Sequence, residues 1–383
     1  MKIALFTDTY PEDVNGVAKT LGFLVRHAAE RGHEVALVTT RVSDEPEPAA
    51  SIHRQLPGIP VPMYPELQLA RGLDRKGRRM LEAFAPDVVH VATESTVGFS
   101  GRRWALSNHI PLVTSFHTNF PAYLPDYHMG PLEPVLWRYL RWFHSRSTTT
   151  FCPSRDTLEM LRDWGFHPRL EVWGRGVETE LFSPARRSRE ARERIAPGAD
   201  RILVYVGRLA AEKRVDFLLD AFLRVRDALD DRIALVFVGD GPAGERLRAR
   251  EEEGVHFTGF LRGAPLAEAF AAADLFVFAS DTETFGNVVL EAISSGVPAV
   301  TVDRGGVTET VIPGRTGVLV PPGDLDAFAG ACIDLLRNEG RRRQLAAGAR
   351  AEALTRRWDE ILDGVLDGYA VAVGKPEPAP VSP

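Results

Sequence analysis

The segment 283–291, Glu-Thr-Phe-Gly-Asn-Val-Val-Leu-Glu, has a carboxylate at each end, Glu283 and Glu291. Phe285, Gly286 and Asn287 are predicted to begin a helix, so Glu283 lies at the mouth of that helix and Glu291 lies one turn into it. The first backbone N–H groups of a helix have no partner within it, so open amides lie between the two carboxylates. One carboxylate can accept hydrogen bonds from the hydroxyls of a sugar and the other from those of a ribose. The alternative is an N-terminal charge and a solvated glutamate.

Two cations, Arg208 and Lys213, follow a predicted strand at 202–206 and lie where the next helix opens. A cation in the first turn of a helix opposes the helix dipole, so a purely solvated role is less natural here. Two cations beside a helix N-terminus suit a diphosphate. Gly16 begins the first helix of the chain, and without a Cβ atom it lets an anionic group approach the backbone.

His117 follows the apolar run at 111–116. In a parallel sheet it would lie at the carboxyl end of a strand, where such sheets bind their ligands. A lone histidine is more often structural, but this position favours a functional role.

The segment 239–244, Gly-Asp-Gly-Pro-Ala-Gly, matches the dinucleotide fingerprint G-x-G-x-x-G. That fingerprint belongs after the first strand of its domain, whereas this segment follows the second. The next strand, 255–259, also ends without the acidic residue that would hold a ribose hydroxyl. We therefore interpret the segment as a tight strand-to-helix turn.

Short apolar strands alternate with helical patterns in both halves of the chain, which predicts an α/β fold with parallel sheets. The fold class is two doubly wound Rossmann-like domains that face each other across a cleft. The first series has strands at 1–7, 33–40, 87–91 and 111–116 and a helix at 16–31; the second has strands at 202–206, 233–238, 255–259, 275–278 and 298–302 and helices at 213–228, 242–252, 265–273 and 287–295.

Four ranges describe the expected domain organisation. An N-terminal Rossmann-like domain spans 1–177, and a C-terminal Rossmann-like domain spans 201–355. The polar, arginine-rich stretch 178–200 is predicted to link them, and the proline-rich tail 373–383 is predicted to be disordered.

The composition of the 383-residue chain is that of a soluble globular protein, with 44% hydrophobic and 26% charged residues. Its two cysteines lack disulfide or zinc spacing, which fits a cytoplasmic location, and we expect no metal or cofactor. No run approaches the ~20 apolar residues of a membrane span. A formal net charge of −6 argues against nucleic-acid binding.

The motifs together resemble the retaining glycosyltransferases of family 4, which have the GT-B fold. The matching segments occur in order along the chain: Asn15-Gly16-Val17-Ala18, His117, Gly207-Arg208-Leu209 with Glu212-Lys213, and 283–291 followed by Gly305-Gly306. The resemblance implies that the N-terminal domain, 1–177, is the acceptor side and that the C-terminal domain, 201–355, binds the nucleotide sugar. It also implies that the last helix, at about 356–372, packs back on the N-terminal domain.

The resemblance also implies roles for the nucleotide end of a donor. Gly16, Arg208 and Lys213 would hold the diphosphate, and Glu291 would hold the ribose. Arg208, Lys213 and the helix N-termini would stabilise the departing phosphate without a metal ion. The phosphate would take the acceptor's proton on the side from which it leaves.

For the sugar, the resemblance implies contacts from Glu283 and from the backbone of residues 285–287. His117 would contact the sugar near the reacting carbon. The base would lie against Phe260 and Leu261. Arg208, Lys213, Glu283 and His117 are therefore the expected catalytic residues.

Within the family, segments 115–121 and 173–178 most resemble bacterial GDP-mannose-dependent α-mannosyltransferases that act on glycolipids. The expected reaction is transfer of a hexose, mannose before others, to a hydroxyl of a lipid or glycolipid. Glucosyl- and sulfoquinovosyl-diacylglycerol synthases, which use UDP-sugars, share much of the pattern. A sugar-nucleotide epimerase and a non-catalytic nucleotide-sugar-binding protein are the alternatives of other classes.

The run Leu67–Leu81 has apolar residues at near-helical spacing with basic residues between them, and 137–143 mixes aromatic residues with arginines. Such a helix can lie on anionic lipid, which would place the protein peripherally on the inner face of the cytoplasmic membrane. An ordinary amphipathic helix is the alternative. The basic residues in question are Arg71, Arg75, Lys76, Arg78 and Arg79.

Overall fold

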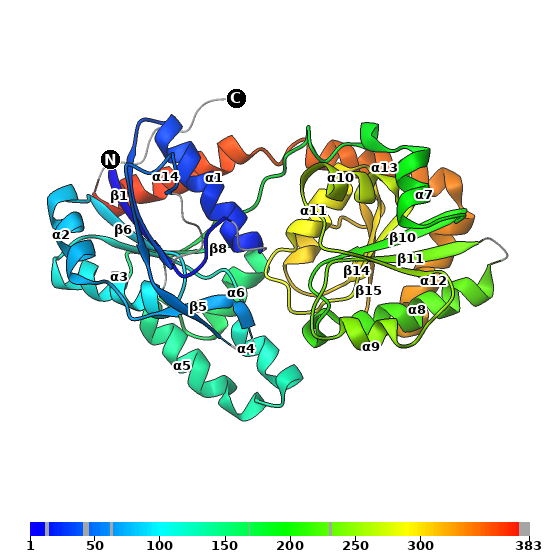
Figure 1. Cartoon of the computed structure of the whole chain (residues 1–383), viewed down its shortest axis with the longest axis horizontal. Coiled ribbons are helices and arrows are strands. Elements are labelled where there is room, and N and C mark those ends of the chain that lie inside the picture. Colours follow the sequence, from blue (N-terminus) through cyan, green and yellow to red (C-terminus); the bar gives the residue numbers. More distant parts are fainter. Residues whose placement is uncertain (12–14, 41–45, 62–63, 168, 230–231, 375–383) are drawn as a thin grey trace. The chain divides into compact units, whose positions relative to one another are not determined.

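The computed structural model describes residues 1–374 apart from 12–14, 41–45, 62–63, 168 and 230–231. The chain forms two compact units (Figure 1). Unit 1 consists of Met1–Pro121, Leu132–Arg175 and Trp358–Pro383, and unit 2 consists of Ala122–Pro131 and Gly176–Arg357. No helix among the described residues is long and apolar enough to cross a membrane.

Unit 1 contains a seven-stranded parallel sheet in the order β3-β2-β1-β6-β7-β8-β9. Its strands are β1 Lys2–Thr7, β2 Glu34–Thr40, β3 Ile52–Leu56, β6 Val88–Val91, β7 Leu112–Ser115, β8 Thr149–Cys152 and β9 Leu170–Val172. The strands predicted in this half are confirmed to within one residue at each end. Helices cover both faces of the sheet (Figure 1), which explains why its central strands β1 and β6 are buried almost throughout and mostly apolar.

The helices of unit 1 include the last helix of the chain, α14. It packs against α1, where Asp363 accepts from His27 at 2.7 Å and Trp358 stacks on Phe23 at 4.7 Å. Tyr369, also on α14, bonds to the buried His90 at 2.6 Å. The helices are α1 Gly16–Glu30, α2 Arg75–Phe84, α3 Thr96–Ser107, α5 Glu133–His144, α6 Arg155–Asp163 and α14 Trp358–Ala372.

Unit 2 contains a six-stranded parallel sheet in the order β12-β11-β10-β13-β14-β15. The strands are β10 Arg201–Val206, β11 Ile233–Val238, β12 Val255–Gly259, β13 Leu275–Phe278, β14 Ala299–Val302 and β15 Gly317–Val320. The helices are α7 Arg189–Ile195, α8 Val215–Ala228, α9 Gly244–Arg248, α10 Gly263–Ala272, α11 Asn287–Ser294, α12 Leu325–Arg337 and α13 Glu339–Ala353. The α/β class and the parallel sheets predicted from the sequence are therefore correct for both units.

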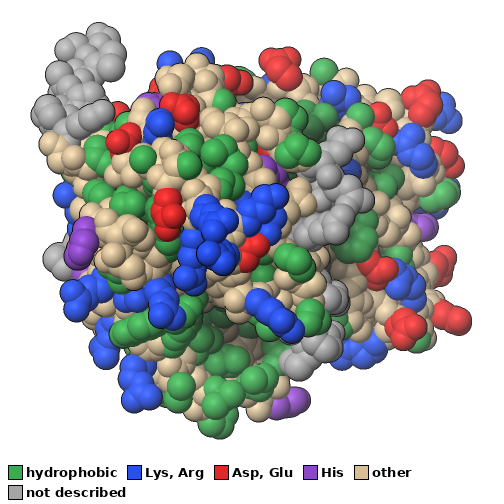
Figure 2. Space-filling model, turned by 60° about the vertical axis from the view of Figure 1, so that its left-hand side comes forward, with side chains coloured by type: hydrophobic (Ala, Val, Ile, Leu, Met, Phe, Trp, Pro, Cys, Tyr) green, Lys and Arg blue, Asp and Glu red, His purple; other side chains and the backbone are tan. Residues whose placement is uncertain are grey.

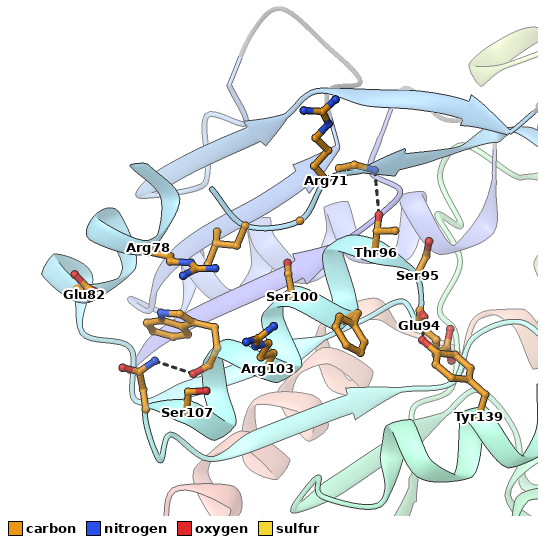
Figure 3. A pocket seen from close by; sticks show the side chains of 16 residues that line it. Arg71, Arg78, Glu82, Glu94, Ser95, Thr96, Ser100, Arg103, Ser107 and Tyr139 are labelled. Carbon is orange, nitrogen blue, oxygen red and sulfur yellow. Dashed lines mark hydrogen bonds between the residues drawn. The ribbon is translucent and has the colours of Figure 1, made fainter. Parts of the chain in front are cut away.

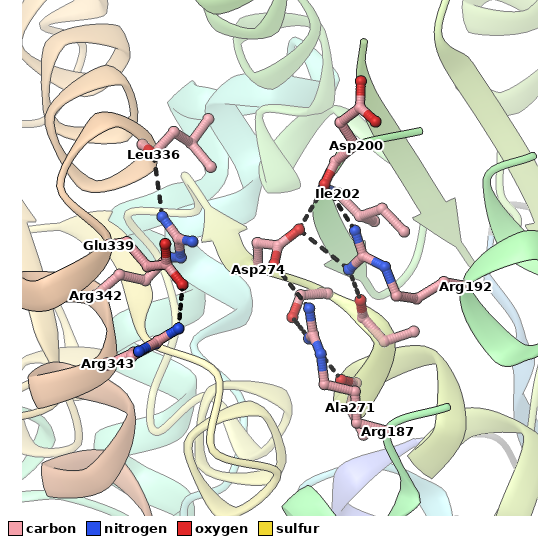
Figure 4. Close-up of polar contacts among 12 residues, drawn as sticks. Arg187, Arg192, Asp200, Ile202, Ala271, Asp274, Leu336, Glu339, Arg342 and Arg343 are labelled. Atoms are coloured by element: carbon pink, nitrogen blue, oxygen red, sulfur yellow. Dashed lines mark hydrogen bonds and ion pairs between the residues drawn. The ribbon is translucent and has the colours of Figure 1, made fainter. Parts of the chain in front are cut away.

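The segment 178–200 is not the linker that its composition predicted, because it packs into unit 2. Phe182, Ala191 and Ile195 are buried in the core of that unit. The buried Asp274 holds the segment in place, since it accepts from Arg187 at 2.8 Å and from Arg192 at 3.1 Å (Figure 4). The many arginines made the segment look solvated, although Ala191 and Ile195 form an apolar pair at helical spacing. Two of the arginines in fact neutralise the buried Asp274.

The helix predicted at Leu67–Leu81 is also wrong in its first half. Tyr64–Ala70 forms β5, which pairs antiparallel with β4, Gly58–Val61. Gly72 follows in the left-handed region at φ 86°. The side chain of Asp74 then accepts from Gly77 N at 2.8 Å, so the helix begins only at Arg75. The tail at 373–383, predicted to be disordered, lies outside the described residues from position 375 onward.

Candidate functional site

The carboxyl-end loops of the unit 2 sheet bring two of the predicted residues into direct contact. Lys213, in the turn after β10, forms an ion pair through Nζ with Oε1 of Glu283, which follows β13. Each side chain is only 16% exposed. Burial opposes the charge of Lys213, but Glu283, Tyr123 and Tyr205 outweigh it and raise its pKa well above the usual value. Lys213 is therefore a firmly cationic group with a defined orientation.

A short segment from the first half of the chain contributes to the surroundings of Lys213. The ring of Tyr123 lies 5.8 Å from Lys213 Nζ. Tyr127 donates to Glu212 at 2.9 Å, and Asp126 pairs with Arg214 at 3.2 Å. The sequence had not indicated these residues, because they lie about 90 residues upstream of the loop that they contact.

Arg208 lies two residues after the end of β10 and is half-buried. The hydroxyl of Tyr205 donates to the carbonyl of Arg208 at 2.8 Å, which fixes the backbone from which the guanidinium extends. Arg208 and Lys213 thus flank the same turn at the carboxyl end of one strand, as predicted. This is the edge at which doubly wound sheets bind ligands.

The helix mouth predicted between Glu283 and Glu291 is confirmed. α11 begins at Asn287, and its cap residue Gly286 is left-handed at φ 84° with no side-chain cap. Phe285 and Glu291 are buried. Val289 N donates to the carbonyl of Gly286 at 2.9 Å, so the N–H groups that the helix itself leaves open to a bound oxygen-rich group are those of Asn287 and Val288.

Two glycines brace the loop that carries Glu283. Gly306 N donates to the carbonyl of Glu283 at 2.8 Å. A Cβ atom on Gly306 would lie 2.1 Å from the carbonyl oxygen of Thr284, and one on Gly305 would lie 2.7 Å from that of Glu283. Both positions therefore need glycine, and the backbone of Gly305-Gly306 fixes the position of the backbone at Glu283.

The glycines of the discounted fingerprint also serve backbone packing. A Cβ atom on Gly239 would lie 2.1 Å from the carbonyl oxygen of Gly207, and one on Gly241 would lie 2.5 Å from that of Leu209. They allow the loop after β11 to approach the loop that carries Arg208. Phe260 and Leu261, predicted to face a base, follow β12; Phe260 is 56% exposed and Leu261 is half-buried.

In unit 1, His117 follows β7 and is held by Arg175. The guanidinium of Arg175 donates to His117 Nδ1 at 2.9 Å and also to the carbonyls of Trp173 and Gly174. Burial and then the Arg175 charge lower the pKa of His117 well below its usual value. The imidazole is thus neutral, and because Nδ1 accepts, its proton lies on Nε2. Arg175 had not been predicted as part of the site.

Gly16 begins α1 at the carboxyl end of β1, as predicted, and is exposed. The preceding Asn15 caps the helix by accepting from Ala18 N at 2.8 Å, and it donates to Thr9 at 2.8 Å. Within the described ranges, no three His, Cys, Asp or Glu side chains are grouped so that they could hold a metal ion.

Comparison with known proteins identifies the family. Residues 200–338 match the family described as Glycosyl transferases group 1, and residues 14–181 match Glycosyltransferase Family 4. A GDP-mannose-dependent alpha-mannosyltransferase of Mycolicibacterium smegmatis is 35% identical over 379 residues, which cover 98% of each chain. This chain belongs to glycosyltransferase family 4. It is a hexosyltransferase, as its motifs implied.

One further relative of this glycosyltransferase is named for a different sugar, and solved structures share its fold. The sulfoquinovosyl transferase SQD2 of Arabidopsis thaliana is 33% identical and covers 93% of this chain and 71% of its own. Among solved structures, sucrose-phosphate synthase of Thermosynechococcus elongatus has a TM-score of 0.78 at 20% identity, covering 98% of this chain and 99% of its own. HepE of Anabaena, solved with UDP and glucose, has a TM-score of 0.77 at 19% identity, covering 97% and 100%. The fold is GT-B.

Proposed function

We propose that this glycosyltransferase moves mannose from GDP-mannose to a hydroxyl of a lipid or glycolipid, with retention at the anomeric carbon. The ion pair between Lys213 and Glu283 carries the proposal, because it joins a phosphate-binding cation to a sugar-binding carboxylate beside the mouth of α11. Mannose is favoured over other hexoses by the full-length similarity to GDP-mannose-dependent mannosyltransferases.

In the proposed reaction, the bond from the anomeric carbon to the diphosphate breaks while the acceptor oxygen approaches from the same side. The departing phosphate oxygen takes the proton of the acceptor hydroxyl. Arg208, Lys213 and the N-terminus of α11 stabilise the negative charge that develops on the phosphate. Glu283 and Asn287 hold the hexose, Glu291 holds the ribose, and Nε2–H of His117 donates to the sugar.

No metal ion is needed in this mechanism, since the two cations and the helix dipole neutralise the leaving group. We therefore expect turnover to be unchanged by a chelator such as EDTA and to need no added divalent ion. A strict requirement for Mg²⁺ or Mn²⁺ in a chelator titration would contradict this account of the leaving group.

A UDP-sugar donor is the second candidate, as in a glucosyl- or sulfoquinovosyl-diacylglycerol synthase. It is supported by similarity to the sulfoquinovosyl transferase SQD2 and to an alpha-monoglucosyldiacylglycerol synthase of Streptococcus pneumoniae. Both relatives are named for a sugar other than mannose, which is why a UDP-sugar is the second candidate donor.

Incubation of the purified protein with GDP-mannose, UDP-glucose and UDP-sulfoquinovose tests the donor. Release of the nucleoside diphosphate is followed with and without a bacterial lipid extract, with Lys213→Ala as the inactive control. Release of GDP that depends on lipid supports the proposal. Release of UDP supports the second candidate, while a changed nucleotide sugar without release would indicate an epimerase. Binding without any turnover would indicate a non-catalytic protein.

We also propose that the protein reaches its acceptor from the membrane surface, through the basic residues around α2. All are exposed and belong to unit 1. Anionic lipid attracts such residues by roughly 1 kcal/mol each. Sedimentation with anionic vesicles at low salt is the direct measurement, and absence of binding would argue against a lipid acceptor.

A further inference from the structure

Three arginines line one cavity of about 650 Å³ in unit 1. Arg71 follows β5, Arg78 lies on α2 and Arg103 lies on α3 (Figure 3). They come from three different elements, so the cavity is a product of the fold rather than of a single basic run. Arg103 was not among the basic residues that the sequence predicted to contact the membrane.

None of these three guanidinium groups has a hydrogen bond or ion pair with another described residue. Other arginines of unit 1 do have such partners: Arg54 pairs with Asp74, and Arg31 pairs with Asp363. The lining also contains two carboxylates. Glu94 is mostly buried and pairs with His144 at 3.3 Å, which leaves Glu82 as the carboxylate opposed to an incoming anion.

Neutral hydrogen-bonding groups accompany the arginines. Ser95, Ser100, Ser107 and Asn108 contribute hydroxyl and amide groups to the lining. A cavity with three cations and several neutral donors fits a phosphate that carries a polar substituent, because guanidinium groups bind phosphate oxygens in pairs.

Exposed apolar side chains adjoin the cavity. Phe99 lines it and is 41% exposed, and its ring lies 6.2 Å from that of Trp142, which is 47% exposed. Tyr139 lines the cavity from α5, and Val135, one turn earlier on that helix, is 54% exposed. Figure 2 shows a face of the molecule on which Lys and Arg side chains gather next to hydrophobic ones. A soluble phosphate needs no apolar surround, whereas a lipid headgroup has acyl chains beside it.

We infer that this cavity binds the phosphate headgroup of an anionic phospholipid. The inference deepens the proposed membrane contact: a general basic surface senses only charge, whereas this cavity selects a phosphate through Arg71, Arg78 and Arg103. It concerns neither the donor nor the sugar transferred.

Matched arginine variants on α2, together with one on α3, test this inference. Arg78→Gln and Arg103→Gln remove cavity guanidinium groups, while Arg75→Gln and Arg79→Gln remove equally exposed cations of α2 that lie outside the lining. Binding is measured by co-sedimentation of the full chain with phosphatidylcholine vesicles containing phosphatidylglycerol. The cavity variants should lose about tenfold to a hundredfold in affinity, as expected for a hydrogen bond to a charged group. The control variants should lose only about fivefold.

Glu82→Gln should have the opposite effect and raise the affinity for anionic vesicles, because it removes the carboxylate that opposes an incoming anion. Equal losses in all four arginine variants would overturn the cavity and leave general membrane attraction intact. Full competition by millimolar glycerol 3-phosphate would indicate a site for a soluble phosphate and would also overturn the inference. Release of nucleoside diphosphate by the same variants shows separately whether the transfer reaction is retained.

Discussion

At the scale of single residues, the ion pair of Lys213 and Glu283 gives the proposed donor site a way to respond to its ligand. A diphosphate that binds Lys213 competes with Glu283 for the same ammonium group. Glu283 then becomes available to accept from sugar hydroxyls. The pair thus keeps both charges neutralised in a largely buried place until phosphate and sugar arrive together.

Substitution of either cation tests the leaving-group role. Arg208→Ala or Lys213→Ala should lower kcat by at least about 100-fold, because each removes one group that stabilises the developing phosphate charge. Initial rates at saturating donor measure the effect. Arg246→Ala, an exposed arginine paired with Asp216, is the matched control and should keep the original rate. Near-normal turnover in both cation variants would remove the proposed role.

Arg175 sets the protonation state of His117, and its substitution should be visible directly. Arg175→Met removes a cation and the donor to Nδ1, so the pKa of His117 should rise and its proton should no longer be confined to Nε2. The ¹⁵N shifts of the His117 ring across pH 5–8 report both changes. His90 and His144 also face His117 and are assigned in the same spectra.

The same variant should lower kcat by about tenfold, as expected when one hydrogen bond to the sugar is misdirected. Arg175→Lys keeps the cation and should recover part of the rate. An unchanged ring spectrum in a folded Arg175→Met protein would show that burial alone keeps His117 neutral.

At the scale of elements, glycine contacts position the loops that carry the site. Gly306→Ala forces a Cβ atom against the carbonyl of Thr284 and should displace the loop of Glu283. We expect kcat to fall more than about tenfold, with a loss of roughly 1–3 kcal/mol in the free energy of unfolding. Gly330→Ala is the control, since nothing lies within 4 Å of its Cβ position on α12. Equal behaviour of the two variants would contradict the bracing role of Gly306.

The burial of His90, on β6 where α14 contacts it, should make the stability of unit 1 depend on pH. Burial lowers the pKa of His90 to about 3, from an ordinary value of 6.5. The unfolded chain therefore binds a proton below pH 6.5 that the folded chain does not, and stability falls as the pH falls toward 3. The loss approaches about 1.4 kcal/mol per pH unit.

Urea unfolding of the wild-type protein and of His90→Gln at pH 7, 6, 5 and 4 measures this dependence. The variant should be less stable at pH 7. As the pH falls, its free energy of unfolding should decrease less steeply than that of the wild type, because it lacks the proton that His90 takes up on unfolding. Parallel curves for the two proteins would show that His90 does not carry the dependence.

The strands that are buried on both faces of a sheet were predicted well. Strands covered on both faces are continuous apolar runs, so β1 and β11 could be located from sequence alone. The prediction failed at β5, where apolar residues beside arginines mimicked a helix, and at 178–200, where arginines that neutralise a buried aspartate looked like a solvated linker.

At the scale of the whole molecule, local motifs in the sequence indicated the fold and the candidate site residues, but not the contacts between distant segments. Glu283 and Lys213 were each predicted, while their pairing, 70 positions apart, was not. The contact of Tyr123 with Lys213 and that of Arg175 with His117 likewise depend on where the chain returns. Motifs record what a residue type can do, and only tertiary packing determines which neighbour it meets.

The chain path of unit 1 has a consequence for its synthesis. Residues 1–175 leave the ribosome first, but α14, which supplies Leu362, Val365 and Tyr369 to their core, follows only after 176–357. At ~5–20 residues per second, the nascent first unit waits roughly 10–40 s for its last helix. During that time the surface that α14 later covers is open to water, so unit 1 can complete its core only after residues 176–357 have been translated.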